Sequence, residues 1–118
     1  MRLLLFVGLG MLVIGCSVEK KATKAFMRGE YQNAINLFNK SKPKEPAKAN
    51  YFVGESYRLS NRIKEAETYY AKAGGAGVDK DSVQFYYAQS LKANTKYNDS
   101  RKQLEELIKR TSNEKLKD

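Results

Sequence analysis

The sequence predicts an all-α protein assembled from repeated helix pairs, and three observations lead to this fold class. From residue 18 onward, apolar residues recur at helical spacing, and the alternating patterns of strands are almost absent. Both prolines, Pro43 and Pro46, lie in one short linker, so the remaining stretches are free of this helix breaker. The segment at 29–38 also aligns with 61–70, which lies 32 residues later, and again with 95–104, a further 34 residues along the chain.

Six helices are expected, and turn residues set several of their ends. Gly29 and Asn61 suit helix C-termini because both tolerate the left-handed conformation, and Pro46 suits a first helical turn. The helices are expected near residues 19–28, 31–41, 47–59, 63–73, 81–93 and 97–110. Residues 111–118 are expected to form a frayed tail.

The aligned copies share columns of residue types that resemble the tetratricopeptide repeat (TPR). The columns of small residues are Ala22, Gly54 and Ala88 in the first helix of each copy, and Ala34, Ala66 and Ser100 in the second. Phe38 and Tyr70 fill the aromatic column four residues later. The resemblance covers residues 18–110 as repeats of about 18–46, 47–80 and 81–110, and the third is degenerate. It implies a TPR-like right-handed α-solenoid that follows an N-terminal signal segment.

The first residues have the architecture of a signal peptide. Arg2 precedes an uncharged apolar run from Leu3 to Ile14, which is too short to span a bilayer as a helix and fits a signal-peptide core. Val13-Ile14-Gly15-Cys16 resembles a bacterial lipobox. The resemblance implies that residues 1–15 are removed and that Cys16, the only cysteine, carries lipid at the new N-terminus of residues 16–17. The alternatives are an ordinary signal peptide with an incidental cysteine, or a buried apolar helix.

The residues after Cys16 predict where in the cell envelope the chain is located. No aspartate follows the cysteine, unlike inner-membrane lipoproteins of the enterobacterial kind, and no acidic run follows it, unlike exported surface lipoproteins of Bacteroidetes. The two comparisons imply a lipid-anchored protein on the periplasmic face of the outer membrane. The formal charge of +9 would otherwise suggest nucleic acid. The periplasm would exclude nucleic acid as a partner, and anionic lipid headgroups or acidic proteins are the better candidates. The alternative, to which most of the charge is attributed, is that the lysines solvate the helix faces.

The composition argues against an enzyme. The chain has no histidine and one cysteine, which removes the commonest general base and any site with several cysteine ligands for zinc. No phosphate-binding loop, dinucleotide fingerprint or nucleophile motif is present. We therefore expect a non-catalytic protein without cofactor or metal.

The first helix of each repeat is expected to line an inner groove where peptides bind, as in repeat solenoids. The groove positions implied by the TPR resemblance are Lys48, Tyr51, Glu55 and Arg58 in the second repeat, and Ser82, Phe85, Gln89 and Lys92 in the third. Tyr51 and Phe85 would be the anchors. The same two rings suit a helical core equally well.

The last predicted helix carries Leu104, Leu107 and Ile108, with no later helix expected to cover them. They predict a packing surface for a partner or for a further domain of a longer protein.

The lipobox followed closely by these repeats also resembles the N-terminus of Bacteroidetes envelope lipoproteins that carry a later OmpA-like domain, some of them in type IX secretion. The expected function is a scaffold for envelope proteins. The alternative is an assembly protein whose last helix packs on a barrel protein or on another copy; the oligomeric state is left open.

Overall fold

The computed structural model describes residues 18–73 and 78–117, and all the regular structure in these ranges is helical. Residues 18–27 form the first helical segment. It is followed by α2 (Tyr31–Lys40), α3 (Pro46–Leu59), α4 (Ile63–Ala71), α5 (Lys80–Ala93) and α6 (Tyr97–Lys117). The predicted all-α class is thus confirmed. The predicted signal segment 1–15 and Cys16 lie outside the described residues.

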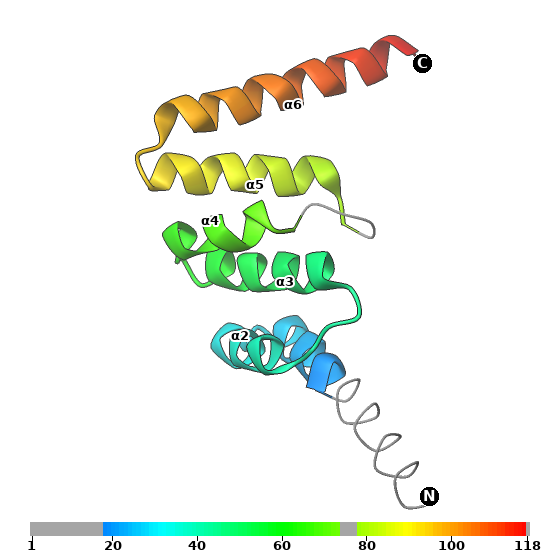
Figure 1. Ribbon diagram of the computed structural model, residues 1–118, viewed down its shortest axis with the longest axis vertical. Coiled ribbons are helices and arrows are strands. Elements are labelled where there is room, and N and C mark those ends of the chain that lie inside the picture. The colour runs from blue at the N-terminus through cyan, green and yellow to red at the C-terminus, as the bar shows by residue number, and fades with distance from the viewer. Residues whose placement is uncertain (1–17, 74–77, 118) are drawn as a thin grey trace, which may run out of the picture.

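The helices are stacked in chain order. Each helix from α2 to α6 packs chiefly on the helices that precede and follow it in the sequence. Figure 1 shows segment 18–27 and α2 at one end of the stack and α6 at the other. Two surfaces at opposite ends of the stack are therefore built from residues far apart in the sequence.

Three of the chain reversals have the same backbone geometry. Gly29, Asn61 and Thr95 all have positive φ, at 77°, 65° and 61°. In each turn the following residue donates its N–H to a carbonyl five positions earlier: Glu30 to Ala25, Arg62 to Tyr57, and Lys96 to Leu91, at 2.7–2.9 Å. Such bonds are typical of a left-handed cap that closes a helix. The turns recur at the offsets that the sequence alignment predicted.

The small residues of the predicted repeat columns are buried in the stack. Ala22, Ala34, Ala66 and Ala88 have no exposed surface. At Gly54, an added Cβ would lie 3.1 Å from two carbon atoms of the Tyr70 ring. The Ser100 hydroxyl is buried and donates a 2.7 Å hydrogen bond to the Ala88 carbonyl, so α5 and α6 are joined at this point.

Aromatic rings fill the core at the N-terminal end. Phe52 on α3 packs edge-on against Phe26, with the centroids 5.0 Å apart, and is stacked on Phe38 of α2 at 5.6 Å. Ile35 and Val53 are buried in the same cluster. Burial of these apolar groups joins the first helical segment, α2 and α3 into one body.

The prediction of a frayed tail after residue 110 is wrong, because α6 continues to Lys117. No glycine or proline interrupts residues 111–117, so nothing local ends the helix. Arg110 pairs with Asp81 of α5 at 2.6 Å, and the Thr111 hydroxyl donates to the Leu107 carbonyl at 3.0 Å. These contacts hold the helix across the point where the sequence pattern fades.

Candidate interaction surface

The predicted groove residues lie on two helices but differ in exposure. Lys48, Tyr51, Glu55 and Arg58 belong to α3, while Ser82, Phe85, Gln89 and Lys92 belong to α5. Lys48, Phe85, Gln89 and Lys92 are exposed, and Tyr51, Arg58 and Ser82 are half-buried. Only Glu55 is buried. The other seven residues remain available as surface.

Glu55 is placed in the interior, contrary to its expected role in the groove. Its side chain faces α4, where its carboxylate accepts a 2.6 Å hydrogen bond from the Tyr70 hydroxyl. Arg58 donates two further bonds to it, at 3.0 and 2.7 Å. Burial, together with the negative Glu55, raises the pKa of Tyr70 well above its ordinary value. Because Glu55 is satisfied by these partners, it is not free to bind a peptide.

Arg58 links the surfaces of α3 and α5. Its guanidinium lies 3.9 Å from the centroid of the Tyr86 ring, a cation–π contact between the two helices. Tyr86 also packs edge-on against Phe85 at 5.4 Å and is stacked on Tyr70 at 6.0 Å. The hydrogen bonds to Glu55 raise the pKa of Arg58 above its ordinary value, which is already high. A permanent cation is thus held over an aromatic ring at the junction of two predicted groove segments.

Tyr86 was missing from the sequence prediction, although its spacing offered a signal. Ser82, Tyr86 and Gln89 are four and three residues apart, so they share one face of α5. The TPR resemblance assigns no groove position to Tyr86. The predicted groove therefore lacks the ring that Arg58 contacts.

Tyr51 combines features of surface and core. It is half-buried on α3 and packs against its neighbour Phe52, with the centroids 5.9 Å apart. Partial burial and the negative charge of Glu55 raise the pKa of its hydroxyl. Tyr51 therefore lies at the boundary between the aromatic core and the surface that continues onto α5.

The predicted packing residues of the last helix meet the predicted groove residues of α5. A hollow of about 400 Å³ is lined by Asp81, Ser82, Phe85, Tyr86, Leu107, Ile108 and Thr111. Phe85 and Ile108 are 41% and 62% exposed, while Leu104 and Leu107 are half-buried. Two surfaces that the sequence suggested separately are one. We call Tyr51, Arg58, Phe85, Tyr86, Leu107 and Ile108 the aromatic face.

A second hollow, not anticipated from the sequence, lies at the other end of the stack. It measures about 500 Å³ between segment 18–27 and α3. Its apolar lining is Met27, Phe38, Ala49 and Phe52, and its polar lining is Glu19, Lys20, Thr23, Lys24, Lys44, Glu45 and Lys48. We call it the basic recess. The spacing of Lys20 and Lys24, one helical turn apart, was the sequence signal that could have indicated it.

Two further properties concern the described part of the chain. Among its helices, none is long and apolar enough to cross a membrane. Within residues 18–73 and 78–117, no three acidic or cysteine side chains gather as the ligands of a metal ion would.

Comparisons with protein-family models, curated proteins and solved structures find no match for this chain. A functional assignment therefore depends on the surfaces described above.

Proposed function

We propose that the chain is a non-catalytic scaffold, anchored by lipid at Cys16, which recruits other cell-envelope proteins through the aromatic face. The observation that carries the proposal is the Arg58–Tyr86 contact, because it joins α3 and α5 into one surface. Proteins of a secretion or gliding machine are the partner class that the lipoprotein resemblance implies. Lipid attachment would place this surface at the periplasmic side of the outer membrane.

The repeated turns support a TPR-like right-handed solenoid as the scaffold. Gly29, Asn61 and Thr95 adopt the same left-handed conformation at offsets close to the length of that repeat. The helices pack in chain order, as repeat proteins do. In a stack of this kind, the first helices of successive pairs would form one binding surface. Tyr51 and Arg58 belong to α3 and Phe85 to α5, the helices that would supply it.

The chemistry of the aromatic face suits a protein partner. Aromatic residues and arginine are enriched at interface hot spots, where they supply large contact areas and directional polar contacts. Arg58 is already oriented by Glu55, so binding would cost it little side-chain entropy. Exposed Phe85 and Ile108 would lose contact with water when a partner covers them.

Recovery of partners from solubilised membranes tests the proposal. The full chain should retain specific proteins, and the double variant Tyr51→Ala with Phe85→Ala should lose them. Met27→Ala is the matched control, since Met27 is 76% exposed but lines the basic recess instead. If the double variant folds normally and keeps every partner, the assignment of the aromatic face is wrong.

The lipid anchor needs a separate measurement. The mass of the N-terminal peptide from membrane-extracted chain should show cleavage after Gly15 and a diacylglycerol on Cys16. Cys16→Ser should leave the chain uncleaved. An unmodified Cys16 in the mature chain would contradict the anchor but leave the partner experiment valid.

An assembly role is the second candidate function, favoured by the exposure of Ile108 at the end of the stack. In this role α6 packs on a barrel protein or on a second copy of the chain. Ile108→Asp should then abolish the complex, and measuring the mass of the purified chain in solution distinguishes the two occupants. A monomer at all concentrations excludes the second copy.

A further inference from the structure

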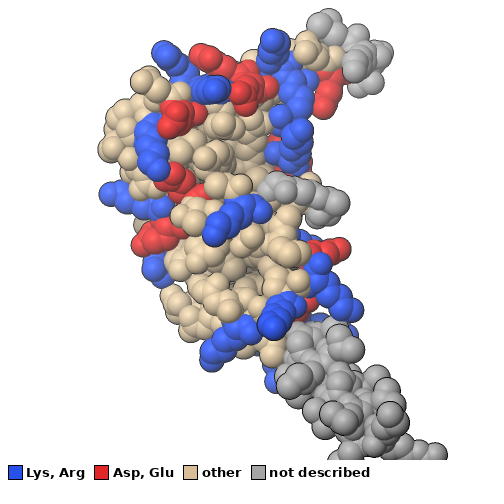
Figure 2. Space-filling view, in the orientation of Figure 1, with Lys and Arg blue, Asp and Glu red and all other residues tan. Residues whose placement is uncertain are grey.

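Positive charge is concentrated at the N-terminal end of the stack. Residues 18–48 contain eight lysines and arginines against three glutamates, which gives +5 of the +9 carried by the whole chain. Figure 2 shows basic side chains at this end, whereas both signs are mixed over the helices at the other end. The charge of the protein is thus polarised along the stack.

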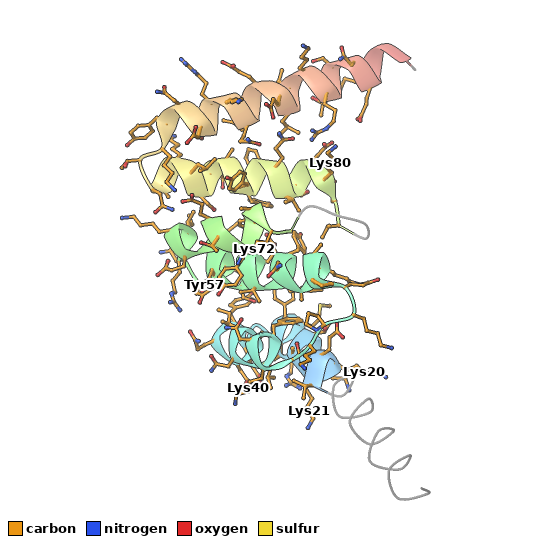
Figure 3. All side chains as sticks on the ribbon, in the orientation of Figure 1. Lys20, Lys21, Lys40, Tyr57, Lys72 and Lys80 are labelled. Atoms are coloured by element: carbon orange, nitrogen blue, oxygen red, sulfur yellow. The ribbon has the colours of Figure 1, made fainter. Side chains whose placement is uncertain are left out.

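The cations cover the solvent side of the first helical segment. Lys20, Lys21, Lys24 and Arg28 are exposed, while Ala22 and Ala25 on the opposite side have no exposed surface. Figure 3 shows Lys21, and Lys40 from α2, pointing away from α3 at this end. In this stretch the ion pairs among described residues engage only Arg28, with Glu30, and Lys48, with Glu45.

An exposed apolar side chain lies among these cations. Met27 is 76% exposed, the largest exposed fraction among the large apolar residues that the structure describes. It lines the basic recess together with Lys20, Lys24, Lys44 and Lys48, and the rings of Phe38 and Phe52 line it too. Glu19 and Glu45 also line the recess, so its net charge is positive. Cations around an exposed apolar group are typical of segments that lie in the interface of a membrane.

From these features we infer that the N-terminal end of the stack is a docking surface for anionic lipid headgroups. The lysines would bind the phosphates, and Met27 would enter the boundary between headgroups and acyl chains. This surface deepens the proposed function, because it orients the anchored scaffold with the aromatic face directed away from the membrane end.

The covalent distance to the proposed anchor supports this orientation. Residue 18 follows Cys16 by two residues, which span at most about 7 Å. Lys20, Lys21 and Lys24 then lie within the next two turns of helix, roughly 9 Å at 1.5 Å per residue. Lys20 and Lys21 therefore lie within about 10–12 Å of Cys16 along the chain and Lys24 within about 16 Å. These distances are roughly one to two Debye lengths at physiological salt, so attraction to anionic headgroups reaches Lys20 and Lys21 best. The diacylglycerol proposed at Cys16 carries two acyl chains, enough for stable attachment, so the basic surface would determine how the stack is oriented on the membrane.

Tryptophan reporters test the surface, because the chain contains no tryptophan. The full chain carrying Met27→Trp is reconstituted with phosphatidylcholine vesicles that either contain or lack phosphatidylglycerol. Its emission should shift to shorter wavelength only with the anionic vesicles, and the shift should disappear at high salt. Ile108→Trp, at the exposed residue of the opposite end, is the control and should not shift. Equal shifts in neutral vesicles, no shift at Met27→Trp, or the same shift at both sites would overturn the inference.

Acylation of lysines gives a second measurement on the unaltered chain. Lys20, Lys21, Lys24 and Lys44 should react about fivefold more slowly on anionic than on neutral vesicles, as expected for about 1 kcal/mol per lysine. The exposed Lys64, Lys102 and Lys109 serve as internal controls and should react equally on both. Uniform reactivity would overturn the inference. The same spectra report whether Cys16 carries lipid, so failure of the anchor is distinguished from failure of the surface.

A charge-matched pair of variants separates local from overall attraction. Replacing Lys20, Lys21, Lys24 and Lys44 by glutamine should abolish the emission shift of Met27→Trp. Replacing Lys64, Lys72, Lys102 and Lys109 by glutamine removes the same charge and should preserve it. If both variants lose the emission shift, overall charge rather than a defined docking surface attracts the chain to the vesicles, and the inference is wrong.

Discussion

The hydroxyl of Tyr70 on α4 donates a 2.6 Å hydrogen bond to the carboxylate of Glu55 on α3. Solvent reaches 2% of Tyr70 and 6% of Glu55, so the bond lies inside the protein. Arg58 completes the carboxylate's partners and extends outward over Tyr86. The interior bond therefore fixes the position of a cation on the aromatic face.

Tyr70→Phe is expected to lower the free energy of unfolding by about 1–2 kcal/mol, because a charged acceptor loses its buried donor. Tyr31→Phe is the control, since the Tyr31 hydroxyl makes no hydrogen bond to any described residue; its effect should stay within about 0.5 kcal/mol. Urea denaturation followed by circular dichroism measures both. Equal effects of the two changes would show that the buried bond contributes nothing of its own.

Gly54→Val should destabilise the protein by about 2 kcal/mol through overpacking. An added Cβ already lies 3.1 Å from the Tyr70 ring, and the ring cannot yield readily because its hydroxyl is held by Glu55. Placing Gly54→Val in a Tyr70→Leu background should reduce its cost, and a double-mutant cycle of unfolding free energies measures this coupling. Additive effects would contradict the proposed clash.

Thr95→Gly should stabilise the protein by about 0.5–1 kcal/mol. Thr95 has φ of 61°, a conformation that is costly for a β-branched residue and free for glycine. Thr111→Gly offers the opposite case, since Thr111 lies within α6 and glycine there should cost about 0.3–0.5 kcal/mol in helix propensity. Thermal melting of both variants shows whether each change raises or lowers the stability. A lower melting temperature for Thr95→Gly would show that the positive φ at Thr95 carries no such cost.

Stability should also depend on the charge of Glu67. Burial would raise the pKa of this carboxyl, but hydrogen bonds from Lys96, at 2.5 Å, and from Asn94 outweigh it and hold the pKa below 4.5, its ordinary value. The unfolded state then binds a proton more readily, so the contribution of Glu67 is complete above pH 4.5 and is lost as the pH falls through the lowered value. Unfolding free energies of wild type and Glu67→Gln should differ near neutral pH and converge in acid. Lys96→Gln should weaken this pH dependence, and an unchanged difference at all pH values would contradict it.

The helical fold could be predicted because its signals are local. Spacing of apolar residues gave the helices, and the small residues Ala66 and Ala88 marked positions that the structure buries completely. The end of α6 could not be predicted in this way. Residues 111–117 are polar apart from Leu116, so they have no apolar period to detect. Arg110, the last residue of the predicted helix, is held by Asp81, 29 positions earlier in the sequence.

The candidate surface was less accessible to sequence reasoning. Glu55 is a charged residue on an amphipathic helix and would ordinarily be solvated. Its burial required both Tyr70 and Arg58 as partners, a combination that only the packed structure reveals. The union of Phe85 with Ile108 likewise depends on how α5 and α6 cross. Residue types in the sequence therefore indicated candidate surface residues, and the packing of the helices determined which of these residues lie together on one surface.

The packing of each helix on its neighbours in the chain also bears on how the protein folds. Few contacts require distant parts of the sequence to find one another, so little loop-closure entropy has to be lost before native contacts form. Helical proteins of this kind fold in roughly microseconds to milliseconds. A helix pair can close as soon as its own residues are available, so this chain can begin to fold before its last helix is available to pack.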